Sequence, residues 1–350
     1  MSASEPSRAD ARWPDSAWIM TALGRRVSVR FAAGVPGPTG GPGFRDVVGF
    51  LESTDVGPGR QWSIRTRTGK AVLVDPTAVV AAKIVPDTPA RLRSASDVDV
   101  ATLESIAAQA WQPLEQLQLG EWVLRAAGGF TGRANSVLPL GDPGVPFDRA
   151  LSEITEWYTA RSLPPMIQVP LPLRTDLDAA LAERGWVAYN AVAVMVCDLD
   201  PLLMATQDVS SQVQLLTLNI TPTPDAAWLA SFRYGDEPVP AAAIPIMTKA
   251  EHPVFVSARG PASDTLAIAR GAICGRWLGI TAVEVAEPYR RRGLGRLVIK
   301  ALAQYAADQG CRHVFLQVAH GNVGARRLYE RLGFVAHHDY VYRRGPGGRR

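Results

Sequence analysis

The chain has 350 residues, 47% of them hydrophobic and 20% charged, with a formal net charge of +4 at pH 7. It can bury a large core, and its length predicts two or three domains. The cysteines, Cys197, Cys274 and Cys311, lack metal or redox spacing, so we expect reduced thiols and no metal site. No apolar run reaches membrane-spanning length and the N-terminus has no secretion core, so we predict a cytoplasmic protein that does not bind membranes.

The N-terminal part predicts a tail followed by a small all-β domain. Residues 1–22 are small and polar, which favours a mobile tail. Residues 23–88 form short alternating apolar runs, separated by a Gly/Pro-rich loop at 34–43 and the turn Thr68-Gly69. This pattern resembles an SH3-like β-barrel that ends in a linker at 86–89. Such barrels bind peptides, nucleic acid or nothing at all, so the pattern leaves the role of this domain open.

The middle segment, residues 99–202, mixes predicted strands with predicted helices. Strands are predicted at 122–127, 133–138, 166–169 and 186–196, and helices at 147–161 and 173–184. The segment Gly128-Gly129-Phe130-Thr131-Gly132-Arg133-Ala134-Asn135-Ser136 follows the first strand and runs into the second. Its polar residues Arg133, Asn135 and Ser136 either meet an acceptor molecule or satisfy one another inside an interface.

The C-terminal segment, residues 210–345, carries the most informative motif. A β-branched strand at 277–285 precedes Arg290-Arg291-Arg292-Gly293-Leu294-Gly295-Arg296, which opens an amphipathic helix. The glycines let the backbone approach an anion, the helix start offers free N–H groups, and four arginines add positive charge. This turn predicts a binding site for the phosphates of a nucleotide-type cofactor.

A second motif follows another predicted strand at 313–318. It reads Asn322-x-x-Ala325-x-x-Leu328-Tyr329-x-x-Leu332-Gly333-Phe334. Together, the two motifs resemble the cofactor-binding half of the GCN5-related N-acetyltransferase (GNAT) superfamily. The resemblance implies an α/β (α+β) fold with a mixed central sheet flanked by helices. It also implies direct transfer of the acetyl group of acetyl-CoA, in a ternary complex, to an amine on a small molecule or a protein.

The resemblance further implies roles for individual residues. The residues expected to bind the cosubstrate are Val283, Val285, Arg290, Arg291, Arg292, Gly293, Leu294, Gly295, Arg296 and Asn322. The glycine turn would hold the CoA pyrophosphate, and the edge at Val283 and Val285 would pair with the pantetheine arm. Asn322 would either bond that arm or cap the helix that it begins. Tyr329 stands at the family's general-acid position, which a core aromatic also suits.

The general base is less clearly indicated. Glu284 alternates with the two valines and is the candidate base, directly or through water, or else a solvated or salt-bridged carboxylate. Some relatives place a glutamate on the next strand, where this chain has Gln317, which cannot act as a base. His320 is a further candidate, with an ordinary loop histidine as the alternative.

The middle segment resembles a second copy of the same domain. Its order of elements matches that of the C-terminal half, and residues 181–187 echo residues 329–335. The connection after Leu138 has three prolines, an acid and no arginine, so this copy should not bind the cosubstrate. We therefore expect tandem GNAT copies, the first of them degenerate. Trp122-Val-Leu-Arg125 followed by 129–136 also resembles a set of bacterial acetyltransferases.

Other features leave the acceptor and the function class open. Trp228, Phe232 and Tyr234 either line the acceptor site or form core, and Asp236-Glu237 either attracts a cationic amine or is a solvated loop. The alternative function is a non-catalytic acyl-CoA sensor or scaffold whose SH3-like domain binds a partner. Nucleic-acid binding ranks last because base-stacking aromatics are sparse in the barrel. The sequence does not indicate an oligomeric state.

Overall fold

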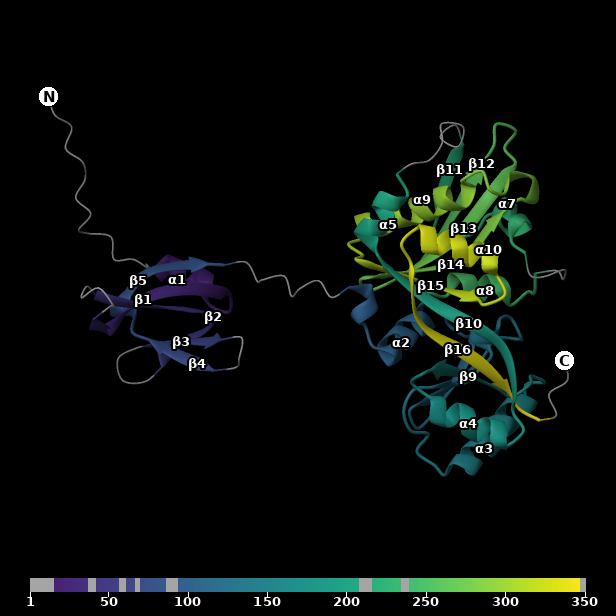
Figure 1. Cartoon of the computed structure of the whole chain (residues 1–350), viewed down its shortest axis with the longest axis horizontal. Helices are drawn as coiled ribbons and strands as arrows, with labels where there is room; N and C mark the ends of the chain where they lie inside the picture. The colour runs from purple at the N-terminus through teal and green to yellow at the C-terminus, as the bar shows by residue number, and fades with distance from the viewer. Residues whose placement is uncertain are drawn as a thin grey trace. The chain divides into compact units, whose positions relative to one another are not determined.

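The structure, a computed structural model, describes residues 16–36, 42–56, 61–66, 70–85, 94–207, 216–233 and 239–346. The chain divides into two compact units, residues 1–92 and 93–350, and each is described by itself (Figure 1). Several predicted features lie outside the described residues: Thr68-Gly69, the linker at 86–89, Tyr234, Asp236-Glu237 and the centre of the Gly/Pro-rich loop. None of the helices in the described part has both the length and the apolarity needed to cross a membrane.

The N-terminal unit is built on one antiparallel sheet in the order β4-β3-β2-β1-β5. Its strands are β1 (Arg26–Pro36), β2 (Pro42–Val56), β3 (Gln61–Thr66), β4 (Ala71–Val74) and β5 (Val79–Ile84). Alternating side chains such as Val29, Leu51 and Ile64 form the buried face. In the described residues β4 and β5 each pair on one side only, so the sheet is open and does not close into the SH3-like barrel that the sequence pattern predicts.

Helix α1 (Ser16–Ala22) lies where the sequence predicts the end of the tail. Ala22 is buried in the core of the N-terminal unit, and the ring of Trp18 stacks on that of Trp62 with 5.7 Å between centroids. Burial of these apolar side chains explains why the segment folds onto the sheet although its neighbours are small and polar.

The C-terminal unit is organised around an eight-stranded mixed sheet in the order β11-β12-β13-β14-β15-β10-β16-β9 (Figure 1). Its strands are β9 (Met166–Leu171), β10 (Val187–Asp198), β11 (Thr217–Thr221), β12 (His252–Arg259), β13 (Thr265–Cys274), β14 (Trp277–Val285), β15 (His313–Ala319) and β16 (Val335–Arg344). Strands β6 (Glu115–Leu119), β7 (Trp122–Ala126) and β8 (Leu138–Pro139) form a separate small sheet.

The helices of this unit are α2 (Val100–Ala110), α3 (Phe147–Thr159), α4 (Thr175–Glu183), α5 (Leu199–Ala205), α7 (Ala226–Ser231), α8 (Ala243–Thr248), α9 (Leu294–Asp308) and α10 (Val323–Arg331). The apolar stripe predicted for α9 is buried, including Leu297, Val298 and Leu302. The strand predicted at 133–138 is wrong in its first part: residues 132–134 form a 3₁₀ turn, and β pairing is limited to a bridge from Val137 to Ile167 and to β8.

The two predicted GNAT copies share one sheet. Strand β10, from the first copy, lies between β15 and β16 of the second and pairs antiparallel with both. In Figure 1, β10 and β16 run side by side from the part that contains α9 and α10 to the part that contains α3 and α4. The boundary expected near 202–210 therefore does not separate compact units.

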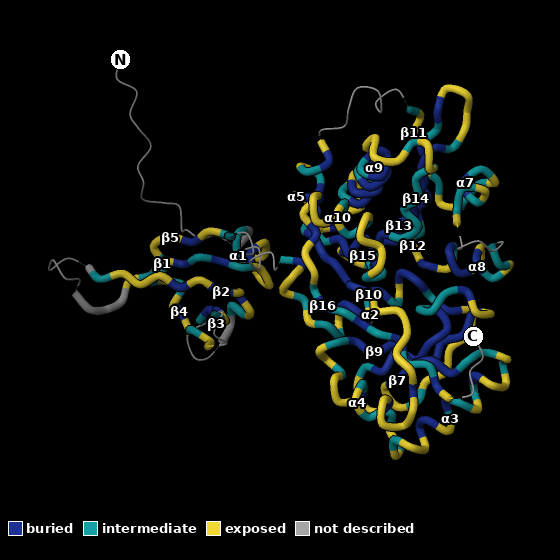
Figure 2. Tube along the Cα trace, turned by 45° about the vertical axis from the view of Figure 1, so that its right-hand side comes forward, coloured by how far each residue is buried: buried dark blue, intermediate teal, exposed yellow. Residues whose placement is uncertain are grey.

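The two faces of the large sheet bury different helices. Helices α5, α9 and α10 pack on one face, against residues such as Leu278, Leu316 and Val318. Helix α2 packs on the other face, where Val194, Phe315 and Tyr340 are buried. Figure 2 shows these buried segments as a continuous interior that runs through the unit. The functional residues can therefore be assigned to a face by their core neighbours.

Candidate active site

The central sheet opens between β14 and β15. These parallel strands pair only from Trp277 and His313 to Ile280 and Leu316. Beyond that point β14 bulges: Ala282 has a φ of +53°, and the register with β13 shifts. The described residues show no further pair between the two strands. The sheet thus has an opening with residues 281–285 on one side and residues 317–319 on the other.

The side chains along the β14 side of the opening alternate between the two faces. Val283 and Val285 pack against the core that contains α9. Glu284 lies between them in sequence, points to the opposite face, and lines a cavity there. This is the arrangement that the sequence pattern predicts for the three residues.

The glycine turn leads from β14 into α9. Residues 290–293 are exposed, Arg291 has a φ of +61°, and Gly293 has a φ of +90° at the N-cap. The first helical hydrogen bond runs from the N–H of Leu297 to the carbonyl of Gly293, at 3.0 Å. The preceding N–H groups of the first turn therefore have no carbonyl within the helix to bond. They mark the positive end of the α9 dipole.

The first three arginines of the turn keep this end electropositive. In the part of the chain that the structure describes, no carboxylate forms an ion pair with Arg290, Arg291 or Arg292. The Nε of Arg290 donates to the carbonyl of Val285, at 3.3 Å, and the Arg292 guanidinium lies 5.5 Å from the ring centroid of Tyr289. Exposed cations beside free N–H groups fit a phosphate group.

Two further positions shape the region around the turn. A Cβ at Gly295 would lie 3.2 Å from Cδ2 of Leu328, so glycine lets α9 approach α10 closely. Asn322 caps α10, because its Oδ1 accepts a hydrogen bond from the N–H of Ala325, at 3.1 Å. This is one of the two predicted roles of Asn322, and it leaves the side-chain NH₂ available to a ligand.

Tyr329 lies in the core under α9, with 8% of its surface exposed and its ring 5.8 Å from that of Phe334. Burial and the negative charge of Glu284 raise the pKa of Tyr329 to about 12. Burial also raises the pKa of Glu284, while the charges of Arg233 and Arg290 act to lower it. At neutral pH Tyr329 therefore keeps its phenolic proton.

The cavity beside Glu284 has a volume of ≈ 210 Å³. It is formed by the end of α7 and the adjacent ends of β13 and β14, and its lining includes Ser231, Arg233, Thr265, Ala267, Glu284 and Ala286. Trp228 does not line this cavity. It stacks on Phe232 and meets Phe255 edge to face, so its role is core packing. The cavity is large enough for the reacting end of a small amine.

The other two residues considered for the base lie on or just beyond β15. Oε1 of Gln317 accepts a hydrogen bond from Nη1 of Arg133, at 2.7 Å. Nε2 of His320 lies 3.1 Å from Oδ1 of Asp339, and both side chains are well exposed. His320 thus has the environment of an ordinary surface histidine.

Comparison with known proteins places the chain in a family. A family model described as "Probable histone acetyltransferase Rv0428c C-terminal" matches residues 97–343, and one described as "Rv0428c N-terminal Sm-like domain" matches residues 21–83. The chain belongs to this acetyltransferase family. The N-terminal domain of the acetyltransferase is thus Sm-like, an all-β type similar to the SH3-like domain that we predicted.

Individual relatives agree with this assignment. The acetyltransferase is 29% identical over 326 residues to a Mycobacterium tuberculosis protein named "Probable histone acetyltransferase Rv0428c", covering 91% of this chain and 94% of the relative. It is 27% identical over 251 residues to the uncharacterized N-acetyltransferase YobR of Bacillus subtilis, covering 70% of this chain and 99% of the relative.

Solved structures show the same fold. A GCN5-related N-acetyltransferase from Kribbella flavida has a TM-score of 0.53 at 22% identity, covering 71% of this chain and 96% of that one. A tandem GNAT protein from the clavulanic acid biosynthesis pathway has a TM-score of 0.50 at 14% identity, covering 71% and 88%. These matches confirm the predicted GNAT fold.

The polar residues of the glycine-rich segment at 128–136 make two kinds of contact in the acetyltransferase. Oδ1 of Asn135 accepts from the N–H groups of Ala127 and Gly129, and its Nδ2 donates to the carbonyl of Thr131. Ser136 is bonded by the buried Arg125 through both its carbonyl and its hydroxyl. Asn135 and Ser136 are thus bonded within the first half of the unit, whereas Arg133 bonds Gln317 of the C-terminal half.

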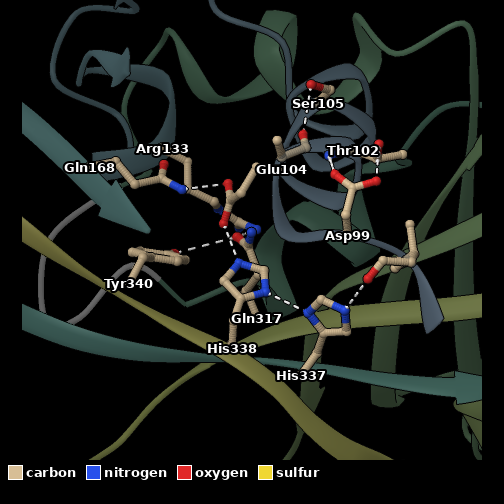
Figure 3. Close-up of polar contacts among 12 residues, drawn as sticks. Asp99, Thr102, Glu104, Ser105, Arg133, Gln168, Gln317, His337, His338 and Tyr340 are labelled. Atoms are coloured by element: carbon tan, nitrogen blue, oxygen red, sulfur yellow. Dashed lines mark hydrogen bonds and ion pairs between the residues drawn. The ribbon is translucent and has the colours of Figure 1, made fainter. Parts of the chain in front are cut away.

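The structure also contains a buried polar chain that sequence reasoning missed, and Figure 3 shows its part from Gln168 through Glu104 to His338 and His337. Arg125 donates to Gln168, Gln168 donates to Glu104, and Oε1 of Glu104 lies 2.9 Å from Nε2 of His338. Nδ1 of His338 lies 2.8 Å from Nδ1 of His337. The members come from four separate elements, so no local spacing could have revealed the chain.

Proposed function

We propose that this N-acetyltransferase moves the acetyl group of acetyl-CoA, the cosubstrate of its superfamily, directly to an amine in a ternary complex. One observation carries the proposal: Glu284 and Tyr329 flank the opening between β14 and β15 from opposite faces of the sheet. If the amine attacks the thioester from the Glu284 side, the CoA thiolate departs on the Tyr329 side. Glu284 can then take the proton of the amine, and Tyr329 can give a proton to the thiolate.

The donor site follows from the glycine turn. N–H groups at the start of α9, together with Arg290, Arg291 and Arg292, would hold the pyrophosphate. The amides of the pantetheine arm would pair with the free edge at Val283 and Val285, because β15 has already diverged there. The NH₂ group of Asn322 is free to bond the same arm.

The reaction assigns one proton transfer to each residue. Glu284 takes a proton from the amine, directly or through water, as the nitrogen forms a bond to the acetyl carbon. The carbon–sulfur bond then breaks, and Tyr329 gives its phenolic proton to the departing thiolate. The high pKa of Tyr329 keeps that proton in place at neutral pH.

The acceptor class is tested separately. The name of the Mycobacterium tuberculosis relative refers to histones, so a lysine in a protein is one acceptor to test for this chain. A small amine is the other, since the cavity beside Glu284 has a volume of ≈ 210 Å³.

The test combines calorimetric titration with acetyl-CoA and a thiol-release assay over amines that include a histone peptide, polyamines and amino acids. Binding together with amine-dependent thiol release supports the proposal. Binding without release from any amine refutes it and supports the acyl-CoA sensor instead. Failure to bind acetyl-CoA contradicts the assigned donor site.

A further inference from the structure

A second cavity lies on the β15 side of the opening. Its volume is ≈ 210 Å³, and its lining includes Arg133, Tyr189, Asn190, Gln317, Tyr340 and Tyr342. Gln317 is the first residue of β15 after Leu316, the last one that pairs with β14. The cavity therefore begins where the sheet opens. No acidic residue is among the described residues that line it.

This cavity and Glu284 lie on the same face of the sheet. Leu316 and Val318 pack against the α9 core, so Gln317 between them points to the opposite face. Glu284 also points away from α9, between Val283 and Val285. Glu284 and Gln317 therefore both point to the same side of the opened sheet.

Arg133 is a cation without a carboxylate partner in the described residues. It donates one hydrogen bond to Gln317 and lies 4.9 Å from the ring centroid of Trp111. A guanidinium has five N–H donors, and among the described residues only one of those of Arg133 is given a hydrogen-bond partner. The acceptor oxygen of Gln317 is engaged by Arg133, which leaves its Nε2 group as another donor.

A second guanidinium reinforces the positive charge. Arg270 lies 4.8 Å from the same Trp111 ring and donates to the carbonyls of Met247 and Ala110. It is fully buried, and burial together with the charge of Arg133 lowers its pKa to about 9. The two cations therefore repel each other, and a bound anion would offset that repulsion.

The nearby buried carboxylate does not fill this role. Glu104 acts on Tyr340 and Tyr342 through its charge, but its oxygens are engaged by His338 and Gln168. Figure 3 shows Glu104 and His338 together with Arg133, Gln317 and Tyr340. The charge of Arg133 is thus left for a group from outside the chain.

We propose that Arg133 binds a carboxylate of the acceptor, so that the enzyme acetylates amines that carry a carboxylate in preference to the same amines without it. This inference rests on the proposed function and narrows its acceptor class. The guanidinium fork matches a carboxylate through two parallel hydrogen bonds, and Nε2 of Gln317 supplies a third donor. The amine of the same molecule then extends across the opening toward Glu284.

The experiment compares amines that differ only by the carboxylate: L-lysine with 1,5-diaminopentane, and L-ornithine with 1,4-diaminobutane. We expect kcat/KM from thiol release to favour the amino acid of each pair by at least about tenfold, the effect of one charge-assisted contact. Arg133→Gln should lower kcat/KM for the amino acids about 10- to 100-fold and leave the diamines unchanged. Arg133→Lys should fall in between.

Arg161→Gln is the matched control, because the guanidinium of Arg161 also stacks on a tryptophan, 3.9 Å from the ring of Trp157, and does not line this cavity. Equal use of both members of each pair, or an equal loss for both in Arg133→Gln, overturns the inference. Calorimetric titration with L-lysine and 1,5-diaminopentane compares their binding affinities and so tests the carboxylate site independently of catalysis. If no amine releases thiol, the proposed function fails, but tighter binding of lysine that depends on Arg133 would still support the carboxylate site.

Discussion

The charge of Glu284 raises the pKa of Tyr329, although the two side chains lie on opposite faces of the central sheet. Both residues lie near the stretch in which β14 no longer pairs with β15. In the proposed reaction these two residues are the base and the acid, so their electrostatic coupling links the two proton transfers. The coupling gives each residue a separate experimental signature.

Tyr329→Phe should lower kcat on the order of 100- to 10,000-fold, because it removes the proton that the thiolate needs, while the affinity for acetyl-CoA stays the same. Stopped thiol-release assays and calorimetry measure the two quantities on one preparation. Tyr305→Phe is the control, since Tyr305 packs against the same core from α9. Unchanged turnover in Tyr329→Phe would remove the residue from the mechanism.

Glu284→Gln should lower kcat by a similar factor and should also change the pH profile. In the wild type we expect kcat/KM to rise with pH through a pKa above the ordinary glutamate value of 4.5, because burial raises it. The variant should lack this acidic limb. Glu287→Gln, at an exposed position nearby, should keep it. An identical limb in Glu284→Gln would assign the base elsewhere.

Glu284→Gln, which should lower activity, should raise stability relative to the wild type at high pH. Since burial raises the folded-state pKa of Glu284 above that of the unfolded chain, the folded protein binds this proton more tightly. The resulting stabilisation is present at low pH and is lost as pH rises through the folded-state pKa. The Tm of Glu284→Gln relative to wild type should therefore be higher at about pH 8 than at about pH 4.5. A difference that falls with pH would contradict the raised pKa.

Local patterns made much of the catalytic half predictable. The spacing of Leu294, Leu297 and Val298 indicates the buried face of α9, and the glycines before it mark the turn, because helix periodicity and turn chemistry depend on neighbouring residues. Alternation along β14 likewise separates Glu284 from its two flanking valines.

Contacts between distant segments were not predictable in this way. Nothing near Val194 indicates that β10 pairs with both β15 and β16, and Arg133 meets Gln317 across 184 residues. The strand predicted at 133–138 failed because the side chain of Asn135 bonds the backbone of its own loop in place of a neighbouring strand.

The glycine turn can be tested with two substitutions on the same helix. Gly293 and Gly310 both have a left-handed φ, +90° and +79°, at opposite ends of α9. Gly293→Glu should abolish acetyl-CoA binding in calorimetry, because it places a negative charge where the pyrophosphate is expected. Gly310→Glu carries the same backbone strain and should bind normally. Loss of binding in both variants would point to strain alone.

The buried chain around Glu104 should dominate the stability of the joint between the two halves. Nε2 of His337 donates to the carbonyl of Val98, and the rings of His337 and His338 continue this series of hydrogen bonds to Glu104. His338→Leu leaves Glu104 buried without this partner and should cost about 3–5 kcal/mol in urea unfolding. Adding Glu104→Leu should recover part of that loss. The exposed pair His320 and Asp339 is the control, worth about 1 kcal/mol or less. Additive losses for His338 and Glu104 would show that the two side chains are not coupled.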